Sequence, residues 1–414
     1  MSREITTGPD GLVPRPTAFD GAVAVLCAAA QLVGAFKATP LLSWSPVDVT
    51  IVTVGLLLAA FAVRLATEPR RVTVPMGGVL LVVAFLPAAL VTVSAGYQAE
   101  KLQGMVVTLV VVVTSASLLT TPVRRRLWLW ALVAGGVVMA LAVHLLPRDA
   151  SVWGRAALEG SNTIATGRTA GTAVVVLAVF LMWPGARHRL LLGAGVLLTA
   201  AAAVDAGSRG PVLFAAASVA VAVVSQRTGR FVRLVALSAA LVIGAVAVSL
   251  DDSAGSARLG VVLNGEATGA ETRQPLWAAA WRAMGDWPRS FWGTGWGGFV
   301  SVLPVGDRLD TGDRQYPHNF ALEAFTEGGW IAGVALVAFV VLSLVRWKRL
   351  ALDRDSLALF AVAVLAVLNA CVSGDLGSNR LAWVVLALAW VQQSAASRPT
   401  AARLPAGAHA GSRV

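Results

Sequence analysis

Charged residues are scarce in this sequence. Only 13% of the 414 residues are Asp, Glu, Lys or Arg, whereas 57% are hydrophobic. A water-soluble protein carries about 25% charged residues, so this composition excludes a soluble globular fold. A helix that spans a bilayer needs roughly 20 apolar residues, and the chain has room for about a dozen such helices. The composition therefore predicts a polytopic integral membrane protein.

Cysteine and lysine are also rare. Cys27 and Cys371 both lie in apolar segments, offer neither a metal-binding spacing nor a disulfide framework, and are expected to be small core residues. The only lysines are Lys37, Lys101 and Lys348, so arginine supplies most of the net charge of +11. The arginines interrupt apolar runs instead of following one soluble face, which argues against a nucleic-acid partner. No zinc-site spacing and no Walker motif is present, so we expect neither a metal nor a cofactor.

Apolar runs recur along the whole chain and predict an all-α polytopic membrane protein. About twelve transmembrane helices are expected, with a long extracytoplasmic loop between the ninth and the tenth. The predicted runs cover residues 19–37, 47–66, 75–95, 102–121, 127–147, 167–183, 189–206, 211–225, 232–250, 318–346, 355–373 and 379–394.

This pattern divides the chain into five predicted parts. Residues 1–18 lack a signal-peptide layout and form a cytosolic arm. Helices one to nine lie within 19–250, and the extracytoplasmic loop with short interfacial helices follows at 251–317. Helices ten to twelve lie within 318–394, and 395–414 is a disordered cytosolic tail.

The distribution of basic residues predicts the orientation in the membrane. If the N-terminus is inside, the inner segments hold 20 Lys and Arg residues, against 7 in the short outer segments. Short cytoplasmic loops carry the excess of Lys and Arg in membrane proteins. Both termini are therefore expected in the cytosol, the loop 251–317 outside, and the protein in the cytoplasmic (inner or plasma) membrane.

The first outward cluster of polar residues is Ser208-Arg209-Gly210-Pro211, in the turn between the seventh and eighth helices. A helix N-terminus presents free N–H groups to an anion, and arginine adds a fork of donors that matches phosphate geometry. The cluster is a candidate phosphate site. An interfacial arginine that only reaches toward water is the alternative.

The second cluster lies in the long loop, where five tryptophans crowd into twenty residues. From Pro275 onward, the spacing of Trp277, Trp281 and Met284 predicts a short helix with one apolar face on the outer membrane surface. Arg273 precedes Trp277 by four residues, so that their side chains share a face. A ligand site and a simple interfacial anchor remain equally open.

A glycine-rich stretch and a histidine cluster complete the set. Pro288, Gly293 and Gly295 permit tight backbone turns close to a ligand, although glycine spacing alone is a weak signal. Farther along, His318 is the only histidine at the outer end of a span beside carboxylates. It could accept a proton from an attacking hydroxyl, with an unperturbed pKa near 6.5. An interfacial hydrogen-bonding histidine is the alternative.

Taken together, the order, spacing and sidedness of these motifs resemble the O-antigen ligase and O-antigen polymerase superfamily over roughly residues 205–345. The resemblance rests on Ser208-Arg209-Gly210, Arg273 with Trp277, Pro288 with Gly293 and Gly295, and His318-Asn319 with Glu323, Glu327 and Gly328. It implies a GT-C-like membrane enzyme that inverts the transferred sugar without a metal. This enzyme moves a glycan from a polyprenyl-pyrophosphate carrier to an acceptor hydroxyl at the outer face of the membrane.

The resemblance also implies roles for individual residues. Arg209 and Arg273 would hold the donor pyrophosphate, and His318 would activate the acceptor. Further substrate contacts would come from Trp277, Arg282, Arg289, Asn319, Glu323 and Glu327. The expected partners are the lipid-linked glycan donor, the lipid bilayer and an acceptor that is a glycan, a lipid or a protein.

Two other functions remain open at the level of the sequence. A solute transporter would suit twelve helices, but its ionisable sites would lie near the middle of the membrane and not at the outer surface. A non-catalytic scaffold for envelope synthesis would tolerate changes at His318 and at both arginines. The choice between ligase and polymerase also stays open.

Overall fold

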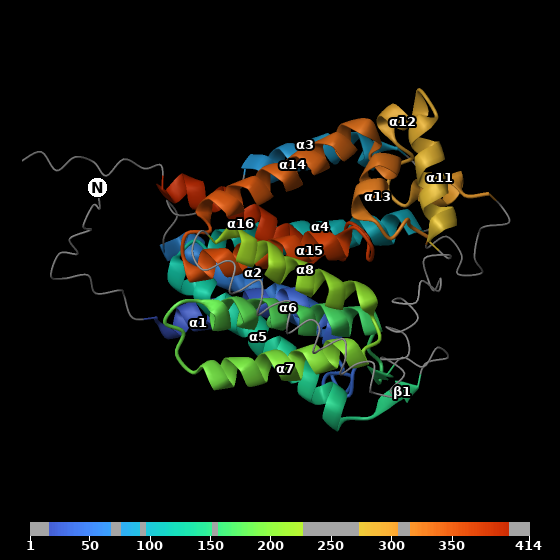
Figure 1. Ribbon diagram of the computed structural model, residues 1–414. Coiled ribbons are helices and arrows are strands. Elements are labelled where there is room, and N and C mark those ends of the chain that lie inside the picture. Colours follow the sequence, from blue (N-terminus) through green and yellow to red (C-terminus); the bar gives the residue numbers. More distant parts are fainter. Residues whose placement is uncertain are drawn as a thin grey trace, which may run out of the picture.

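The computed structural model describes residues 16–67, 76–91, 97–150, 156–226, 273–304 and 315–396. Most of these residues form helices that lie side by side in one bundle (Figure 1), which confirms the predicted all-helical fold class. A short antiparallel hairpin of β1 (Arg148–Ala150) and β2 (Ala156–Leu158) is also present and was not predicted.

Every predicted apolar run within the described residues contains a helix, and the run 232–250 lies outside them. Six of the described helices, α1, α2, α4, α5, α6 and α14, are long and apolar enough to cross a membrane, so the chain is a multi-pass membrane protein. The long helices are α1 (Ala18–Phe36), α2 (Val49–Thr67), α3 (Met76–Leu90), α4 (Tyr97–Leu118), α5 (Pro122–Leu145), α6 (Thr163–Met182), α7 (Arg189–Asp205), α8 (Arg209–Ser225), α14 (Gly329–Leu350), α15 (Arg354–Ala370) and α16 (Arg380–Ala396).

The tenth predicted run, 318–346, is not one helix. It is divided into α13 (Phe320–Glu327) and α14, with the break at Gly328 and Gly329. Gly329 has a φ of +73°, and a Cβ added there would lie 2.3 Å from the Phe291 carbonyl oxygen. Only glycine accepts both this conformation and this close approach, so the run breaks where two glycines follow each other.

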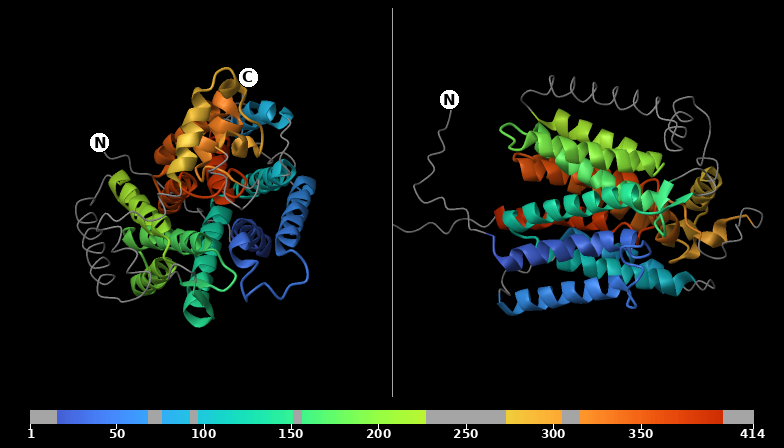
Figure 2. Two further views of the ribbon diagram at one scale, coloured as in Figure 1. Left: turned by 90° about the vertical axis from the view of Figure 1, so that its right-hand side faces the viewer. Right: turned by 90° about the horizontal axis from the view of Figure 1, so that it is seen from below.

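The described part of the predicted loop folds against α13 at one end of the bundle. It forms α11 (Gln274–Gly285), α12 (Arg289–Trp292) and the 3-10 helix η2 (Gly298–Val302), which Figure 2 shows gathered with α13 over one side of that end. We call this end the site end.

The predicted short helix after Pro275 is present as α11, and the placement of its Trp277 and Trp281 face on the membrane surface stays a prediction. Trp281 is 61% exposed, whereas Met284 is buried. Another face of α11 packs on η2 and α13. It consists of Leu276, Ala279, Ala280 and Met284.

At the opposite end of the bundle, α1 begins and α16 ends (Figure 1). Because Arg124, Arg126 and Arg354 lie there, it is called the basic end. Thr17 caps α1 in a reciprocal capping box with Asp20. The Asp20 carboxylate also accepts a hydrogen bond of 2.6 Å from Arg124 at the start of α5. Close by, Arg126 pairs with Asp355 at 2.5 Å, which ties α5 to α15. These charges mark the basic end as an aqueous face.

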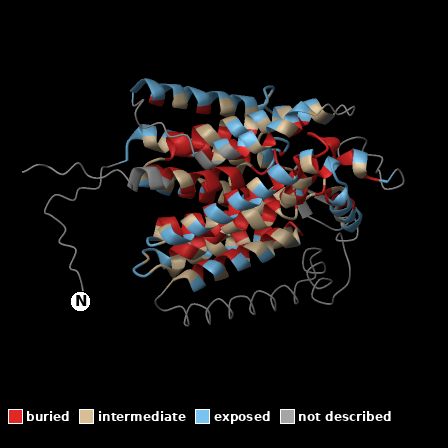
Figure 3. Cartoon of the chain, turned by 90° about the horizontal axis from the view of Figure 1, so that it is seen from above, coloured by how far each residue is buried: buried red, intermediate tan, exposed pale blue. Residues whose placement is uncertain are grey.

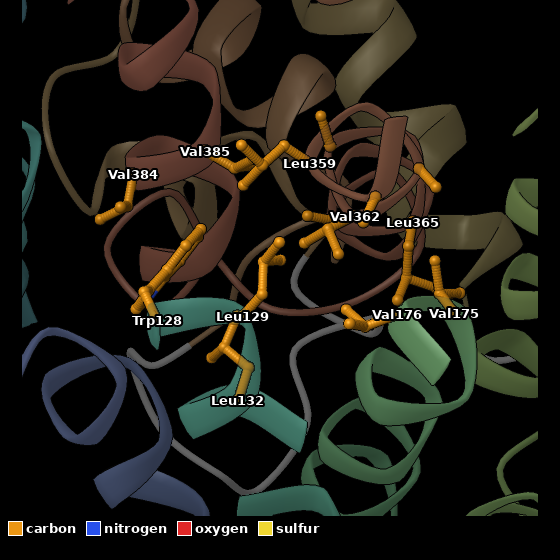
Figure 4. Close-up of a cluster of buried hydrophobic side chains, with 14 of the residues drawn as sticks. Trp128, Leu129, Leu132, Val175, Val176, Leu359, Val362, Leu365, Val384 and Val385 are labelled. Atoms are coloured by element: carbon orange, nitrogen blue, oxygen red, sulfur yellow. The ribbon is translucent and has the colours of Figure 1, made fainter. Parts of the chain in front are cut away.

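The main apolar core joins α5, α6, α15 and α16. Figure 4 shows side chains from these four helices pointing toward one another, among them Trp128, Val176, Leu359 and Val384, all of them at most 1% exposed. Where α5 crosses α6, Gly136 lets the helices approach so closely that a Cβ there would lie 2.4 Å from the Ala173 Cβ. Small residues bring helices together in the same way in membrane bundles generally.

The outward faces of the bundle are apolar as well. Figure 3 shows exposed positions along the outside of helices whose inner faces are buried. On α2, Ile51 is 71% and Leu56 is 52% exposed. A contiguous apolar exterior of this kind is unfavourable in water and favourable in lipid, which agrees with a chain that spans the membrane.

Candidate functional site

The site end is built around a buried ion-pair cluster. Lys101, near the start of α4, places its Nζ 2.5 Å from Glu323 Oε1 and 2.5 Å from Glu327 Oε2, and all three side chains are at most 1% exposed. The glutamates are four residues apart on α13, so both carboxylates face the same ammonium group. The cluster holds α13 against α4, although Lys101 and Glu327 are 226 residues apart in the sequence.

Each glutamate also holds a second segment of the chain. Glu323 Oε2 accepts a hydrogen bond of 3.0 Å from the Leu376 amide, in the connection 371–379 between α15 and α16. Glu327 Oε2 accepts one of 3.1 Å from the Gly297 amide. Both carboxylates are enclosed by protein, so the structure does not place these two predicted substrate-binding residues at an open surface.

The glycine-rich stretch packs on α13. Gly293 and Gly295 have φ values of +80° and +81°, and a Cβ at Gly293 would lie 2.2 Å from the Glu327 carbonyl oxygen. The Gly295 amide donates to that same oxygen at 3.0 Å. The predicted tight turns are present, but the group they approach is the end of α13 and not an open ligand space.

His318 lies directly before α13 and is fixed by both of its neighbours. The Pro317 carbonyl oxygen accepts a hydrogen bond of 2.8 Å from Trp277 Nε1 on α11. The Asn319 side chain caps α13 by accepting from the amides of Ala321 and Leu322 at 3.0 and 3.1 Å. Asn319 and Trp277, both predicted to contact substrate, thus hold the backbone on either side of the histidine.

The backbone of His318 adopts a left-handed conformation with a φ of +53°. Such a conformation is uncommon for residues other than glycine, and strained residues of this kind concentrate at functional sites. The imidazole packs on the Tyr316 ring, with 4.3 Å between the ring centroids. Tyr316, His318 and Arg273 therefore form one group at the site end, since the charge of Arg273 also reaches the imidazole.

The environment keeps His318 neutral. Burial and the positive charge of Arg273 lower the pKa of the imidazole from its ordinary 6.5 to about 4, while the carboxylate of Asp375 acts in the opposite direction. The pKa of His318 therefore departs from the unperturbed value near 6.5, because protonation of a half-buried imidazole beside a guanidinium is unfavourable. Burial also raises the pKa of Tyr316 to about 12, so that its phenol stays neutral.

Arg168, in the second turn of α6, reaches the same place. Its Nη1 donates to Asn379 Oδ1 at 3.0 Å, and its Nη2 donates to the carbonyl oxygens of Asn369 and Ser373 at 2.8 and 2.6 Å. These bonds join α6 to the ends of the connection 371–379. Arg168 interacts electrostatically with Tyr316 and Arg273, so it belongs to the His318 group.

The predicted phosphate site at Arg209 is only partly described. The turn before α8 packs on α6, because a Cβ at Gly167 would lie 3.2 Å from Pro211 and 3.4 Å from the Ser208 side chain. Gly167 is the neighbour of Arg168, so the backbone of this motif lies beside the Arg168 segment. The side chain of Arg209 lies outside the part of the chain that the structure describes.

The remaining predicted contacts lie apart from His318. Arg282 is exposed on α11, and Arg289 donates to Ser301 Oγ at 3.1 Å. The charges that act on His318 come from Arg273 and Asp375 and not from these two arginines. Of the loop tryptophans, Trp281, Trp287 and Trp292 are exposed by 61%, 70% and 53%, whereas Trp296 is buried against Phe85.

Four residues of the site end were not singled out from the sequence: Lys101, Arg168, Tyr316 and Asp375. Lys101 and Arg168 each stand at the edge of an apolar run, and an ionisable residue within a membrane segment is by default a functional candidate. The sequence therefore contained a signal that could have identified Lys101 and Arg168. Tyr316 and Asp375 lie in short connections, and nothing in the sequence relates either of them to His318.

Comparison with known families agrees with the motifs. A family model described as O-antigen ligase matches residues 194–337, which include the turn before α8, the segment α11–α12, and His318 with α13. The resemblance to the O-antigen ligase and polymerase superfamily is thereby confirmed. A search of curated proteins finds no match.

The buried cluster should be essential for stability. We expect Lys101→Met to lower the free energy of unfolding by about 3–5 kcal/mol, because it leaves two buried carboxylates without a cation. The matched control is Lys37→Met, which removes the exposed pair of Lys37 and Asp48 at 3.3 Å and should cost about 0–1 kcal/mol. Thermal unfolding in detergent micelles measures both, and equal losses for the two variants would contradict this account.

Proposed function

We propose that this chain, whose residues 194–337 match the O-antigen ligase family, is a membrane glycan transferase. It moves a glycan from a polyprenyl-pyrophosphate carrier to an acceptor hydroxyl at the outer face of the cytoplasmic membrane, during synthesis of cell-envelope polysaccharide. The observation that carries the proposal is the group at the site end, where a neutral imidazole lies beside an arginine. A base and a cation at the membrane surface are what this transfer requires.

The reaction assigns one task to each group. His318 accepts the proton of the acceptor hydroxyl, and the hydroxyl oxygen forms a bond to the anomeric carbon as the bond to the pyrophosphate oxygen breaks. The electron pair leaves with the pyrophosphate, and the guanidinium groups of Arg273 and Arg209 stabilise its charge. Attack from the face opposite the leaving group inverts the anomeric configuration.

Asn319, Glu323, Glu327 and Trp277 act as positioning residues in this proposal. Asn319 and Trp277 hold the backbone on either side of His318 by hydrogen bonds, and the two glutamates hold α13 against α4 through Lys101. Arg282 and Arg289 are exposed at the surface with Trp281, Trp287 and Trp292. That surface suits contacts with the glycan or with lipid headgroups, because aromatic rings gather at the membrane interface.

An apolar groove next to the site supports a lipid-linked donor. It has a volume of about 190 Å³ and lies between α3 and α4, where α14 and α16 form its floor. Trp296 of the glycine-rich stretch also lines it, and the Gly297 amide that follows bonds to Glu327. The carrier chain next to the pyrophosphate would fit this groove, which is lined by Leu81, Phe85, Leu102, Met105, Phe339 and Trp383.

The same proposal fixes the topology. Twelve spans would place 1–18 and 395–414 in the cytosol and the loop 251–317 outside. The described helices support this, because α1 begins and α16 ends at the basic end whereas α11 lies at the site end (Figure 1). The predicted span 232–250 lies outside the described residues, and its crossing remains part of this proposal.

A transporter is the less suitable alternative. Lys101, Glu323 and Glu327 are ionisable and buried, as transport sites often are. However, Lys101 pairs with both glutamates, each glutamate also accepts from a backbone amide, and all three have partners within the protein. The proposal leaves the acceptor open as a glycan, a lipid or a protein, and does not separate ligase from polymerase.

Replacing His318 tests the reaction itself. We expect His318→Ala to lower the transfer rate about 10²–10⁴-fold, the usual contribution of a general base. Donor binding should remain, since the arginines are unchanged. The measurement is transfer from a purified polyprenyl-pyrophosphate glycan, with donor binding recorded separately. If binding falls in proportion to transfer, His318 is a ligand or structural residue and not the base.

The pH dependence distinguishes the free protein from the donor complex. The base must be neutral, so kcat/KM should stay level from pH 8 to pH 5 and fall as His318 is protonated near its pKa of about 4. Bound pyrophosphate offsets the charge of Arg273 and raises the pKa of His318, so kcat should fall at a higher pH than kcat/KM. Thermal unfolding at each pH controls for loss of the fold. If kcat and kcat/KM both fell near pH 6.5, the proposed environment of His318 would be contradicted.

Labelling of single cysteines tests the topology. In a chain with Cys27 and Cys371 replaced by alanine, Ala278→Cys on the exposed side of α11 should react with a membrane-impermeant maleimide in intact cells. Leu352→Cys, 85% exposed between α14 and α15, should react only after permeabilisation. The reverse pattern would invert the orientation and remove the site from the outer face.

A further inference from the structure

Arg168 is a cation inside a membrane-spanning helix to which the proposed reaction assigns no role. It lies in the second turn of α6, and its Nε is buried without a hydrogen-bond partner. A charged side chain within a membrane segment costs free energy and is retained, as a rule, where it meets a partner or a substrate.

The hydrogen bonds of Arg168 orient the guanidinium without neutralising it. Its acceptors are the Asn379 side-chain amide and the carbonyl groups of Asn369 and Ser373, all of them uncharged. Three of its five N–H groups are used in this way. The group is thus rigidly held, and its positive charge remains.

The charged residues around Arg168 increase the free energy needed to hold its positive charge inside the membrane segment. Arg168 interacts electrostatically with Arg273, which has the same sign, and with Tyr316, whose high pKa keeps the phenol neutral. Among the described residues, no carboxylate forms an ion pair with Arg168. Two guanidinium groups this close, one of them without a carboxylate partner, favour binding of a multivalent anion between them.

The position of Arg168 identifies the anion. Tyr316 connects Arg168 to His318, and the turn before α8 that contains the Arg209 motif packs beside the same part of α6. We propose that Arg168 is a third cation of the donor site, which binds the pyrophosphate of the lipid carrier together with Arg273. This inference rests on the proposed function, because it assumes that the donor headgroup lies beside His318.

Binding of two lipid probes tests the role of Arg168. The probes are a glycan-free polyprenyl pyrophosphate and the matching polyprenyl monophosphate, bound to the full-length protein in nanodiscs. Arg168→Gln should weaken pyrophosphate binding about tenfold to a hundredfold, as the loss of a charge-assisted contact does, and should weaken monophosphate binding less. Arg168→Lys should retain most of the affinity, because charge is what Arg168 contributes once three of its N–H groups are used internally.

The matched control is Arg64→Gln. Arg64 is also a buried arginine in a membrane helix, but it lies on α2 toward the basic end and bonds to Thr120, so its loss should leave the affinity for both probes unchanged. Wild-type affinity in Arg168→Gln would overturn the inference. So would equal losses for both probes in Arg168→Gln and Arg168→Lys with a matching drop in unfolding temperature, because that result marks a structural cross-link.

Failure of the proposed function gives a different result. In that case the folded wild-type protein would bind neither probe, and the assignment of Arg168 would fall with the donor site. If the wild-type protein binds polyprenyl pyrophosphate and only the Arg168 variants behave as the control does, the donor site stands and Arg168 is excluded from it.

Discussion

The arrangement of the site end depends on one ammonium group enclosed between two carboxylates. Lys101 brings a charge into a buried part of the bundle, and Glu323 and Glu327 both pair with it. Ion pairs lose much of their attraction to desolvation, so the net gain over an apolar contact can be small. The ion pairs fix the orientation of α13 relative to α4, because an ammonium group bound to two oxygen atoms permits few arrangements of the two helices.

The orientation of α13 also determines the positions of the segments that are bonded to it. Each carboxylate also accepts a hydrogen bond from a backbone amide, one in the connection 371–379 and one in the glycine-rich stretch. Three neighbouring contacts hold His318 in place: the hydrogen bond from Trp277 to Pro317, the Asn319 cap of α13 and the packing on the Tyr316 ring. The histidine makes few strong bonds itself. Its placement results from a framework of bonds that surrounds it.

The two parts of the site end differ in electrostatic character. The Lys101 cluster is closed, because opposite charges meet there and the side chains exclude water. Around His318, by contrast, Arg168 has neutral acceptors and the imidazole stays uncharged beside Arg273. Burial stabilises an ion pair with good geometry and disfavours a charge without one. The first part therefore suits structure, and the second suits an anionic substrate.

The sequence was informative where structure follows from local pattern. Apolar runs located the helices, and the proline and apolar spacing located α11, because both signals extend over consecutive residues. Contacts between residues that lie far apart in the sequence could not be predicted from it. The four-residue spacing of Glu323 and Glu327 predicted a shared face, yet the lysine that pairs with them lies more than 200 residues earlier. The glycines signalled tight turns, and only the fold reveals that these turns enclose the end of α13.

The connection between α15 and α16 has a consequence for how the protein matures. It supplies two of the three acceptors for Arg168 and the amide for Glu323, and it is synthesised after the helices that carry those residues. A nascent chain that has already inserted α14 carries His318 and Arg273 without the support that orders them. The group around His318 can thus be ordered only after α15 and α16 have been made and have packed beside α6 and α13.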